Sequence, residues 1–186
     1  CQRLGPGSLR RHRHPVNRNR LDLAPPGRGE VRHSHHAGVA RVRPGVARRG
    51  ELAAIERIFN DPQCRLLTLT GVGGIGKTRL AIEFATRSAS EFPGGIFYIP
   101  LTQINSPAEI VPAIADILDF VFSGPTDPKE QLINYLANNI KQKTLFILDN
   151  LETVLRLTSP QDRNASLVGL VGELLERLPD IKILGT

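Results

Sequence analysis

Residues 71–78 combine the residue types that bind a phosphate group. The stretch Gly-Val-Gly-Gly-Ile-Gly-Lys-Thr satisfies the pattern GxxxxGK[ST], and it lies between an apolar, strand-like run and a helical pattern. Glycine adopts positive φ angles and lets the backbone approach a ligand, so successive N–H groups can converge on a phosphate. A helix that begins near Lys77 adds unpaired amides and the positive end of its dipole. The spacing therefore predicts a site for a nucleoside triphosphate.

The side chains of this loop have separate expected roles. Lys77 should place its ammonium between the β- and γ-phosphates, for binding and for catalysis, and the Thr78 hydroxyl should coordinate Mg²⁺. A glycine-rich turn without a ligand is the competing interpretation. The predicted nucleotide-binding set of the loop is Gly71, Gly73, Gly74, Ile75, Gly76, Lys77, Thr78 and Arg79.

An acid at the end of another strand supplies the second metal ligand. The run Leu-Phe-Ile-Leu-Asp closes at Asp149, which should emerge at the carboxyl edge of a parallel sheet, where ligands bind. We assign Asp149 to Mg²⁺, through water, and to catalysis; an N-cap for a following helix is the alternative. Asn150 follows Asp149, and an amide cannot accept a proton from the attacking water, so we expect slow hydrolysis of the nucleotide. Glu152 could accept that proton instead, although its position favours a residue on the surface of a helix.

Alternating strand and helix patterns must position these residues. We expect strands at 65–70, 95–101, 144–149 and 181–186, the first of them buried. We expect helices at 51–59, 77–92, about 107–120, 128–142 and 165–178. Apolar strands separated by helices indicate an α/β fold, with a parallel sheet covered on both faces and right-handed crossovers.

The first 45 residues differ in composition from the rest. Residues 1–50 carry twelve arginines against Asp22 and Glu30, whereas 51–186 carry more acids than bases, so the net charge of +6 belongs to the N-terminal segment. Such a segment cannot bury enough apolar surface to fold. We expect 1–45 to be disordered or artefactual, as from a misread gene, and 46–186 to form one domain. Its histidines have no carboxylate or cysteine set at ligand spacing, which argues against a metal site. The segment also has no aromatic residues on which bases could stack, which argues against a nucleic-acid-binding arm.

The two motifs together resemble those of the STAND class of P-loop NTPases, in particular the NB-ARC-like ATPase domain of bacterial AfsR- and LuxR-type regulators. The matching segments are TLTGVGGIGKTRLA (68–81) and LFILDNLE (145–152). Upstream, VARRGEL (46–52) is similar to the family's V-G-R-E-x-E-L element, which lies beside the adenine, and this makes Arg48 a candidate nucleotide contact. Ala47 and Arg49 depart from that pattern. Downstream, KILGT (182–186) is similar to the start of the sensor 1 strand.

This resemblance implies a three-layer P-loop NTPase sandwich. Its five-stranded parallel sheet would place the P-loop strand between the sensor 1 strand and a fifth strand, and four strands are readable here. One edge of the P-loop strand would then be unpaired, which predicts weak nucleotide affinity or poor solubility. The resemblance also implies ATP or ADP with Mg²⁺, a nucleotide-controlled switch, ATP-dependent self-association, and winged-helix and repeat domains further along the full-length protein. DNA would be contacted only through such an effector domain.

Composition limits the remaining classes. The two cysteines, Cys1 and Cys64, indicate neither a disulfide framework nor a zinc site, and no apolar run is long enough to span a bilayer or to serve as a signal peptide. We therefore expect a cytoplasmic domain without a membrane partner. The chain begins with Cys1 and contains no methionine, so we also expect it to be part of a longer protein.

Two functions compete with the switch. A conventional ATP-driven enzyme, such as an AAA+ machine or a DNA-acting ATPase, should have a carboxylate at position 150, where the chain has Asn150. A pure binding module would use the basic segment on nucleic acid, with a strong salt dependence. The DxxG and NKxD motifs of GTPases and the LSGGQ-like signature of ABC transporters are absent from the sequence.

Overall fold

Four parallel strands form the middle layer of the structure. The computed structural model describes residues 49–157 and 167–186. Its strands are β1 (Leu66–Thr68), β2 (Gly95–Pro100), β3 (Thr144–Asp149) and β4 (Ile181–Gly185). They lie in the order β1-β4-β3-β2, and every pair is parallel. The predicted α/β fold with a parallel sheet is confirmed, and β1 lies beside β4, as the resemblance implied.

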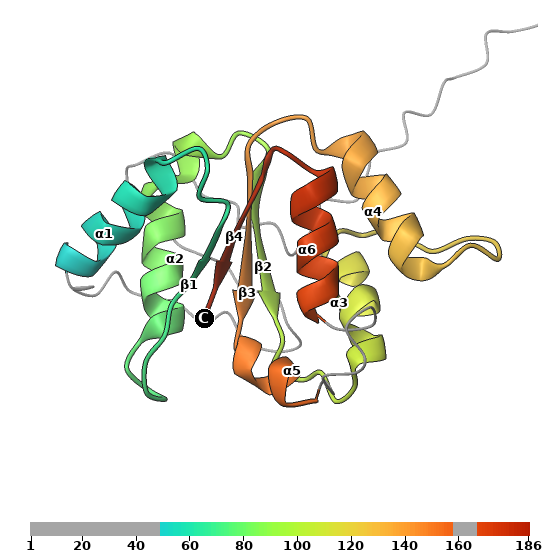
Figure 1. The fold of residues 1–186 in the computed structure, drawn as a ribbon, viewed down its shortest axis with the longest axis horizontal. Helices are drawn as coiled ribbons and strands as arrows, with labels where there is room; N and C mark the ends of the chain where they lie inside the picture. Colours follow the sequence, from blue (N-terminus) through green and yellow to red (C-terminus); the bar gives the residue numbers. More distant parts are fainter. Residues whose placement is uncertain (1–48, 158–166) are drawn as a thin grey trace, which may run out of the picture.

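Helices cover both faces of this sheet, which gives the expected three-layer sandwich (Figure 1). One face carries α1 (Arg49–Asn60) and α2 (Lys77–Arg87). The other carries α3 (Ile110–Ile117), α4 (Pro128–Asn139) and α6 (Leu167–Arg177). The shorter helices are η1 (Ala89–Glu91), η2 (Pro107–Glu109) and α5 (Leu151–Leu157). Two predicted helices, 77–92 and 107–120, are therefore each divided between an α-helix and a 3₁₀ turn.

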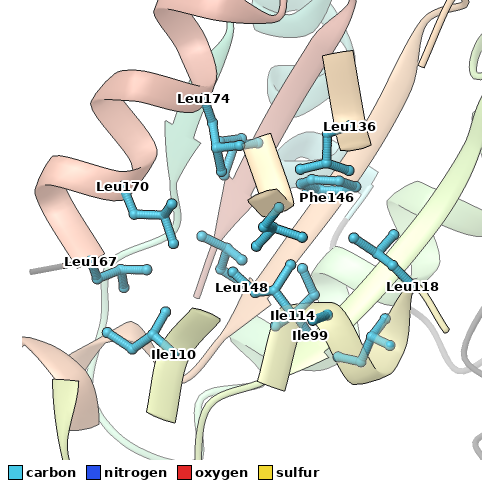
Figure 2. Packing of buried hydrophobic residues seen from close by; sticks show 14 of the residues in the cluster. Ile99, Ile110, Ile114, Leu118, Leu136, Phe146, Leu148, Leu167, Leu170 and Leu174 are labelled. Carbon is cyan, nitrogen blue, oxygen red and sulfur yellow. The ribbon is translucent and has the colours of Figure 1, made fainter. Parts of the chain in front are cut away.

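The central strand β3 is buried along its whole length, and it anchors both cores. Phe146 and Leu148 point toward α3, α4 and α6, where Figure 2 shows them packed among side chains such as Leu136 and Leu170. Leu145 and Ile147 alternate to the opposite face and pack with α1 and α2. A strand held on both faces fixes the position of the carboxylate at its C-terminal end.

The edge strand β1 differs from the prediction. Leu66 and Thr68 are exposed, and Leu67, on the face toward α1 and α2, is only partly buried. The strand covers three residues rather than the six of 65–70, and a cleft separates one of its faces from α5 and α6. The prediction of a buried first strand is wrong, because β1 lies at the edge of the sheet.

Several expectations fall on parts of the chain that the structure does not describe. The segment 1–45, the proposed boundary at residue 46 and Arg48 all lie outside the described residues, so the division of the chain into two regions stays a prediction. Within the described residues, no helix has both the length and the apolar character needed to cross a membrane.

Candidate functional site

The loop between β1 and α2 presents open backbone amides at a helix end. Gly76 is the N-cap of α2 and has a φ of 98°, a left-handed backbone conformation that residues with a Cβ rarely adopt. Gly74, with a φ of 77°, has the same property, and Gly73 lies exposed beside it. Because Gly76 has no side chain to cap the helix, the N–H groups of the first turn are available to an anion.

Lys77 lies across this loop. Its Nζ donates to the carbonyl oxygens of Gly71, at 2.8 Å, and of Val72, at 3.4 Å. The ammonium is thus held within the curve of the loop, where a bound phosphate can replace these neutral acceptors with charged oxygens. Charge-assisted hydrogen bonds are the stronger kind, so this exchange favours the anion.

The other predicted loop residues frame this arrangement. A Cβ at Gly71 would lie 3.2 Å from Ile75 Cγ2, so Gly71, at the start of the loop, packs closely against the Ile75 side chain. The side chain of Ile75 is half exposed, and Arg79 lies exposed in the first turn of α2. Neither contacts the Asp149 carboxylate through a hydrogen bond that the structure records among described residues.

Three hydroxyl groups surround the carboxylate of Asp149. Thr78 Oγ1 donates to Asp149 Oδ1 at 2.6 Å, and Thr186 Oγ1 donates to the same oxygen at 2.5 Å. The Tyr98 hydroxyl donates to Oδ2 at 2.5 Å. Asp149 is buried, with only 7% of the residue exposed. The structure therefore brings together the two residues that the sequence assigned to a metal, and it adds two donors that the motifs do not contain.

The oxygen atoms at this position suit Mg²⁺. Mg²⁺ is bound by one or two carboxylates together with phosphate and water oxygens, and Thr78 and Asp149 supply a hydroxyl and a carboxylate next to the phosphate loop. The described residues contain no group of three or more His, Cys, Asp and Glu side chains that could hold a metal. A cation here would therefore depend on nucleotide phosphates for the rest of its ligands.

The surroundings of Tyr98 keep its hydroxyl protonated. Burial raises the pKa of the Tyr98 phenol far above its usual value, and the hydrogen bond to Asp149 and the negative charge of that carboxylate raise it further. Tyr98 therefore acts as a neutral donor throughout the physiological pH range. A neutral donor stabilises the carboxylate without cancelling the negative charge that a cation would meet.

Asn150 turns away from the carboxylate. Its Nδ2 donates to Thr153 Oγ1 at 2.7 Å, and its backbone N–H donates to Thr186 Oγ1 at 3.1 Å. The carbonyl of Asn150 accepts from the N–H of Thr153, so Asn150 rather than Asp149 begins the turn into α5. Glu152 is exposed on the first turn of α5.

The sequence analysis missed Tyr98 and Thr186. In the parallel register, Tyr98 pairs with Ile147 and Pro100 pairs with Asp149, so Tyr98 lies diagonally across from the carboxylate and on the same face. Thr186 follows Gly185, which pairs with Leu148, so the next pair in register joins Thr186 to Asp149. The strand order was needed to find both; the only signal in the sequence is a hydroxyl residue near the end of each apolar strand.

Two clefts open beside the loop, one on each face of β1. The α1-side cleft, of about 280 Å³, lies between α1, β1 and the start of α2, and Ala54, Ile55 and Leu67 are among its lining residues. The α6-side cleft, of about 540 Å³, lies between β1, α5 and α6. Lys77 lines both clefts, so either cleft adjoins the position expected for the phosphates.

A protein-family model described as the NACHT domain matches residues 65–186. The chain belongs to the NACHT domain family. This NACHT chain is therefore a STAND-class P-loop NTPase domain, a nucleotide-binding ATPase module, and the resemblance to that class is confirmed. The matched residues contain the phosphate loop, Asp149 and Thr186, so the family match covers the site that the structure assembles.

The NACHT chain is also similar to a mycobacterial protein. It is 33% identical over 124 residues to the "Putative HTH-type transcriptional regulator" of Mycobacterium tuberculosis, an alignment that covers 67% of this chain and 12% of that protein. The chain thus spans about an eighth of the length of this curated relative.

Solved structures with a similar fold include an ORC2 protein and a Cdc6p protein. The Aeropyrum pernix ORC2 protein, solved as ADPNP-ADP complexes, has a TM-score of 0.56 and 20% sequence identity, over 78% of this chain and 42% of that one. Cdc6p of Pyrobaculum aerophilum has a TM-score of 0.53 and 17% identity, over 78% and 40% of the two chains. At these identities the likeness shows the fold alone.

Proposed function

We propose that this NACHT chain is an ATP- and ADP-binding switch module of a signal-transducing or transcriptional regulator, with slow Mg²⁺-dependent ATP hydrolysis. The observation that carries the proposal is the contact of 2.6 Å between Thr78 Oγ1 and Asp149 Oδ1, directly beside the open amides of the phosphate loop. This contact joins the phosphate loop on α2 to the acidic end of β3. A cation held beside these two residues would respond to the number of phosphates present.

In this proposal the amides of residues 71–78 and Lys77 bind the phosphates, and Thr78 and Asp149 hold Mg²⁺. Bound Mg²⁺ would neutralise charge on the β- and γ-phosphates. We place the base in the α1-side cleft, because Ala54, Ile55 and Leu67 offer apolar contacts there and because Arg48 directly precedes α1 in sequence. That the ORC2 protein was solved with ADPNP and ADP supports adenine as the base.

The switch follows from the difference between ATP and ADP. Only ATP provides a γ-phosphate for Lys77 and the cation, so the two nucleotides stabilise different arrangements by different contacts. The NB-ARC-like assignment, ATP-dependent self-association, a cytoplasmic location and further winged-helix and repeat domains belong to the same proposal. The similarity to a protein named as a transcriptional regulator supports the regulatory output, with DNA contacted by another domain.

Slow hydrolysis is favoured over a conventional ATPase by the position of Asn150. Its amide cannot accept a proton, and its side chain is bound to Thr153 rather than turned toward Asp149. Glu152 is an exposed carboxylate that lines the α6-side cleft together with Lys77. Its exposure supports the interpretation as a surface helix residue.

Nucleotide binding is tested by replacing Lys77. We expect Lys77→Ala to weaken ATP affinity by roughly 10- to 100-fold in calorimetry, since hydrogen bonds to charged groups contribute about 1.5–3 kcal/mol. Lys141→Ala is the matched control, because Lys141 is an exposed lysine at the end of α4 that donates only to the Ala137 carbonyl among recorded contacts of the described residues. Unchanged affinity in Lys77→Ala would contradict the assignment of the phosphate loop.

A further inference from the structure

The hydroxyl of Tyr98 reaches Asp149 from a strand that carries none of the nucleotide motifs. We propose that Tyr98 is a positioning residue for the Mg²⁺ site, whose hydroxyl orients the Asp149 carboxylate toward Thr78 and the cation. This inference rests on the proposed function, because it concerns the metal of the same site. It assigns a role to β2, which otherwise serves as an edge of the sheet.

The two carboxylate oxygens of Asp149 have different partners. Oδ1 accepts from Thr78 and Thr186, whereas Tyr98 is the recorded donor to Oδ2 among the described residues. The terminal torsion of an aspartate is broad and roughly two-fold, so donors on one oxygen alone leave the plane of the carboxylate poorly fixed. A donor on Oδ2 completes the constraint, and it leaves the lone pairs of the Thr78 hydroxyl available to a cation.

The position of the Tyr98 hydroxyl is itself fixed by the sheet. The residue pairs with Ile147 in the parallel register, two residues before the Pro100 and Asp149 pair. Its ring packs against the core on the α1 and α2 side, where Ile96 and Leu145 are buried. A diagonal neighbour in a sheet is within reach of an aromatic side chain, and the length of tyrosine brings its hydroxyl to the carboxylate.

Loss of the Tyr98 hydroxyl should therefore weaken Mg²⁺ binding more than nucleotide binding. The phosphate loop joins β1 to α2, whereas Tyr98 lies on β2 and its hydroxyl donates to Asp149 at the end of β3. Asp149 as a residue is 7% exposed, so solvent has little access to replace the missing donor. Groups that orient a metal ligand typically change metal affinity 10- to 100-fold when they are removed.

The test compares ATP binding with and without Mg²⁺ in Tyr98→Phe, which keeps the ring and removes the hydroxyl. ATP affinity is measured by calorimetry at increasing Mg²⁺ concentrations. We expect the Mg²⁺ concentration that produces half of the maximal change in ATP affinity to rise about tenfold in Tyr98→Phe. ATP affinity in EDTA should stay within about twofold of the wild type, because the phosphate contacts are unchanged. A merely structural role would instead lower ATP affinity equally with Mg²⁺ and in EDTA.

The chain provides a matched control, since it contains only two tyrosines. Tyr135 lies on α4 and stacks on Phe120, with ring centroids 4.5 Å apart, on the opposite side of the sheet. Tyr135→Phe should leave both affinities unchanged. In an Asp149→Asn background, Tyr98→Phe should add no further loss of the Mg²⁺ effect, because the charged acceptor is already gone.

The outcomes separate this inference from the function on which it rests. An unchanged or strengthened Mg²⁺ effect in Tyr98→Phe, or equal losses with Mg²⁺ and with EDTA, would overturn the role of Tyr98 alone. A full additional loss in the Asp149→Asn background would do the same. If the wild-type chain bound no ATP, the proposed function would fail as well, and the Lys77→Ala comparison would already show it.

Discussion

At the scale of single residues, Asn150 holds a backbone conformation that few residue types accept. Its φ is 66°, in the left-handed region, where asparagine is tolerated because its short polar side chain can bond locally. Here that bond goes to Thr153 Oγ1, and the backbone N–H of Asn150 reaches Thr186. The residue after Asp149 thus joins β3, the end of β4 and α5. This conformation accounts for an amide at position 150 without a role in proton transfer.

We expect Asn150→Ala to lower the free energy of unfolding by about 1–2 kcal/mol, since alanine in the left-handed region costs about that much. The rate of ATP hydrolysis should change by no more than roughly threefold, and in the wild type it should stay well below tens per second. Urea unfolding and a phosphate-release assay measure the two quantities. Asn150→Gly, which accepts the same φ, should lose less stability than Asn150→Ala. A large fall in hydrolysis in both variants would instead assign Asn150 to the chemistry.

The sequence could predict those site residues that act through local spacing. The order of the glycines, Lys77 and Thr78 predicts a loop that leads into a helix, and Asp149 closes an apolar run. The structure has that loop before α2, and it brings Thr78 into contact with Asp149. Tyr98 and Thr186 could not be found in this way, because their relation to Asp149 exists only through the order and register of the strands.

At the scale of elements, β4 contains a buried lysine that joins it to α1. Lys182 is 6% exposed, and its Nζ donates to the carbonyls of Phe59 at 2.6 Å, Asp61 at 2.8 Å and Cys64 at 2.9 Å. These carbonyls belong to the end of α1 and to the turn that leads into β1. The apolar run IKILGT was enough to predict the strand. The role of Lys182 could not be predicted, because the carbonyls that it binds lie more than 100 positions earlier in the sequence.

We expect Lys182→Met to lower the free energy of unfolding at pH 7 by about 1–3 kcal/mol, because buried carbonyls lose their donor. Burial, followed by the charge of Lys143, lowers the pKa of Lys182. The folded state therefore releases this proton at a lower pH than the unfolded state does, so the stability contributed by Lys182 rises with pH up to the unfolded value of about 10.5. The gap between wild type and Lys182→Met should widen from pH 7 to pH 10 in urea unfolding. Lys141→Met is the exposed control, and a narrowing gap would contradict the assignment.

At the scale of the whole molecule, the sheet is well covered on the side of β2 and β3 and open at β1. The sequence predicted the layers correctly, because strands buried on both faces and amphipathic helices have distinct periodicities. It failed at β1, because an apolar run looks the same whether its strand lies inside a sheet or at an edge. The α6-side cleft lies along this edge, and Leu66, Leu155 and Val168 are exposed in its lining.

An apolar cleft beside a strand edge that pairs with no further described strand promotes association between copies of a chain, since both the apolar surface and the backbone groups of that edge can gain partners. We therefore expect the 186-residue chain to self-associate as its concentration rises, and Val168→Lys to reduce this association in light scattering. Val168 is 63% exposed, so a lysine there should cost little stability while it places a charge in the cleft. Val121→Lys is the matched control, because Val121 is 83% exposed and lies outside the cleft, so it adds the same charge without covering the apolar surface. Equal reductions in both variants would assign the effect to net charge alone, and would show that the open face of β1 does not drive association.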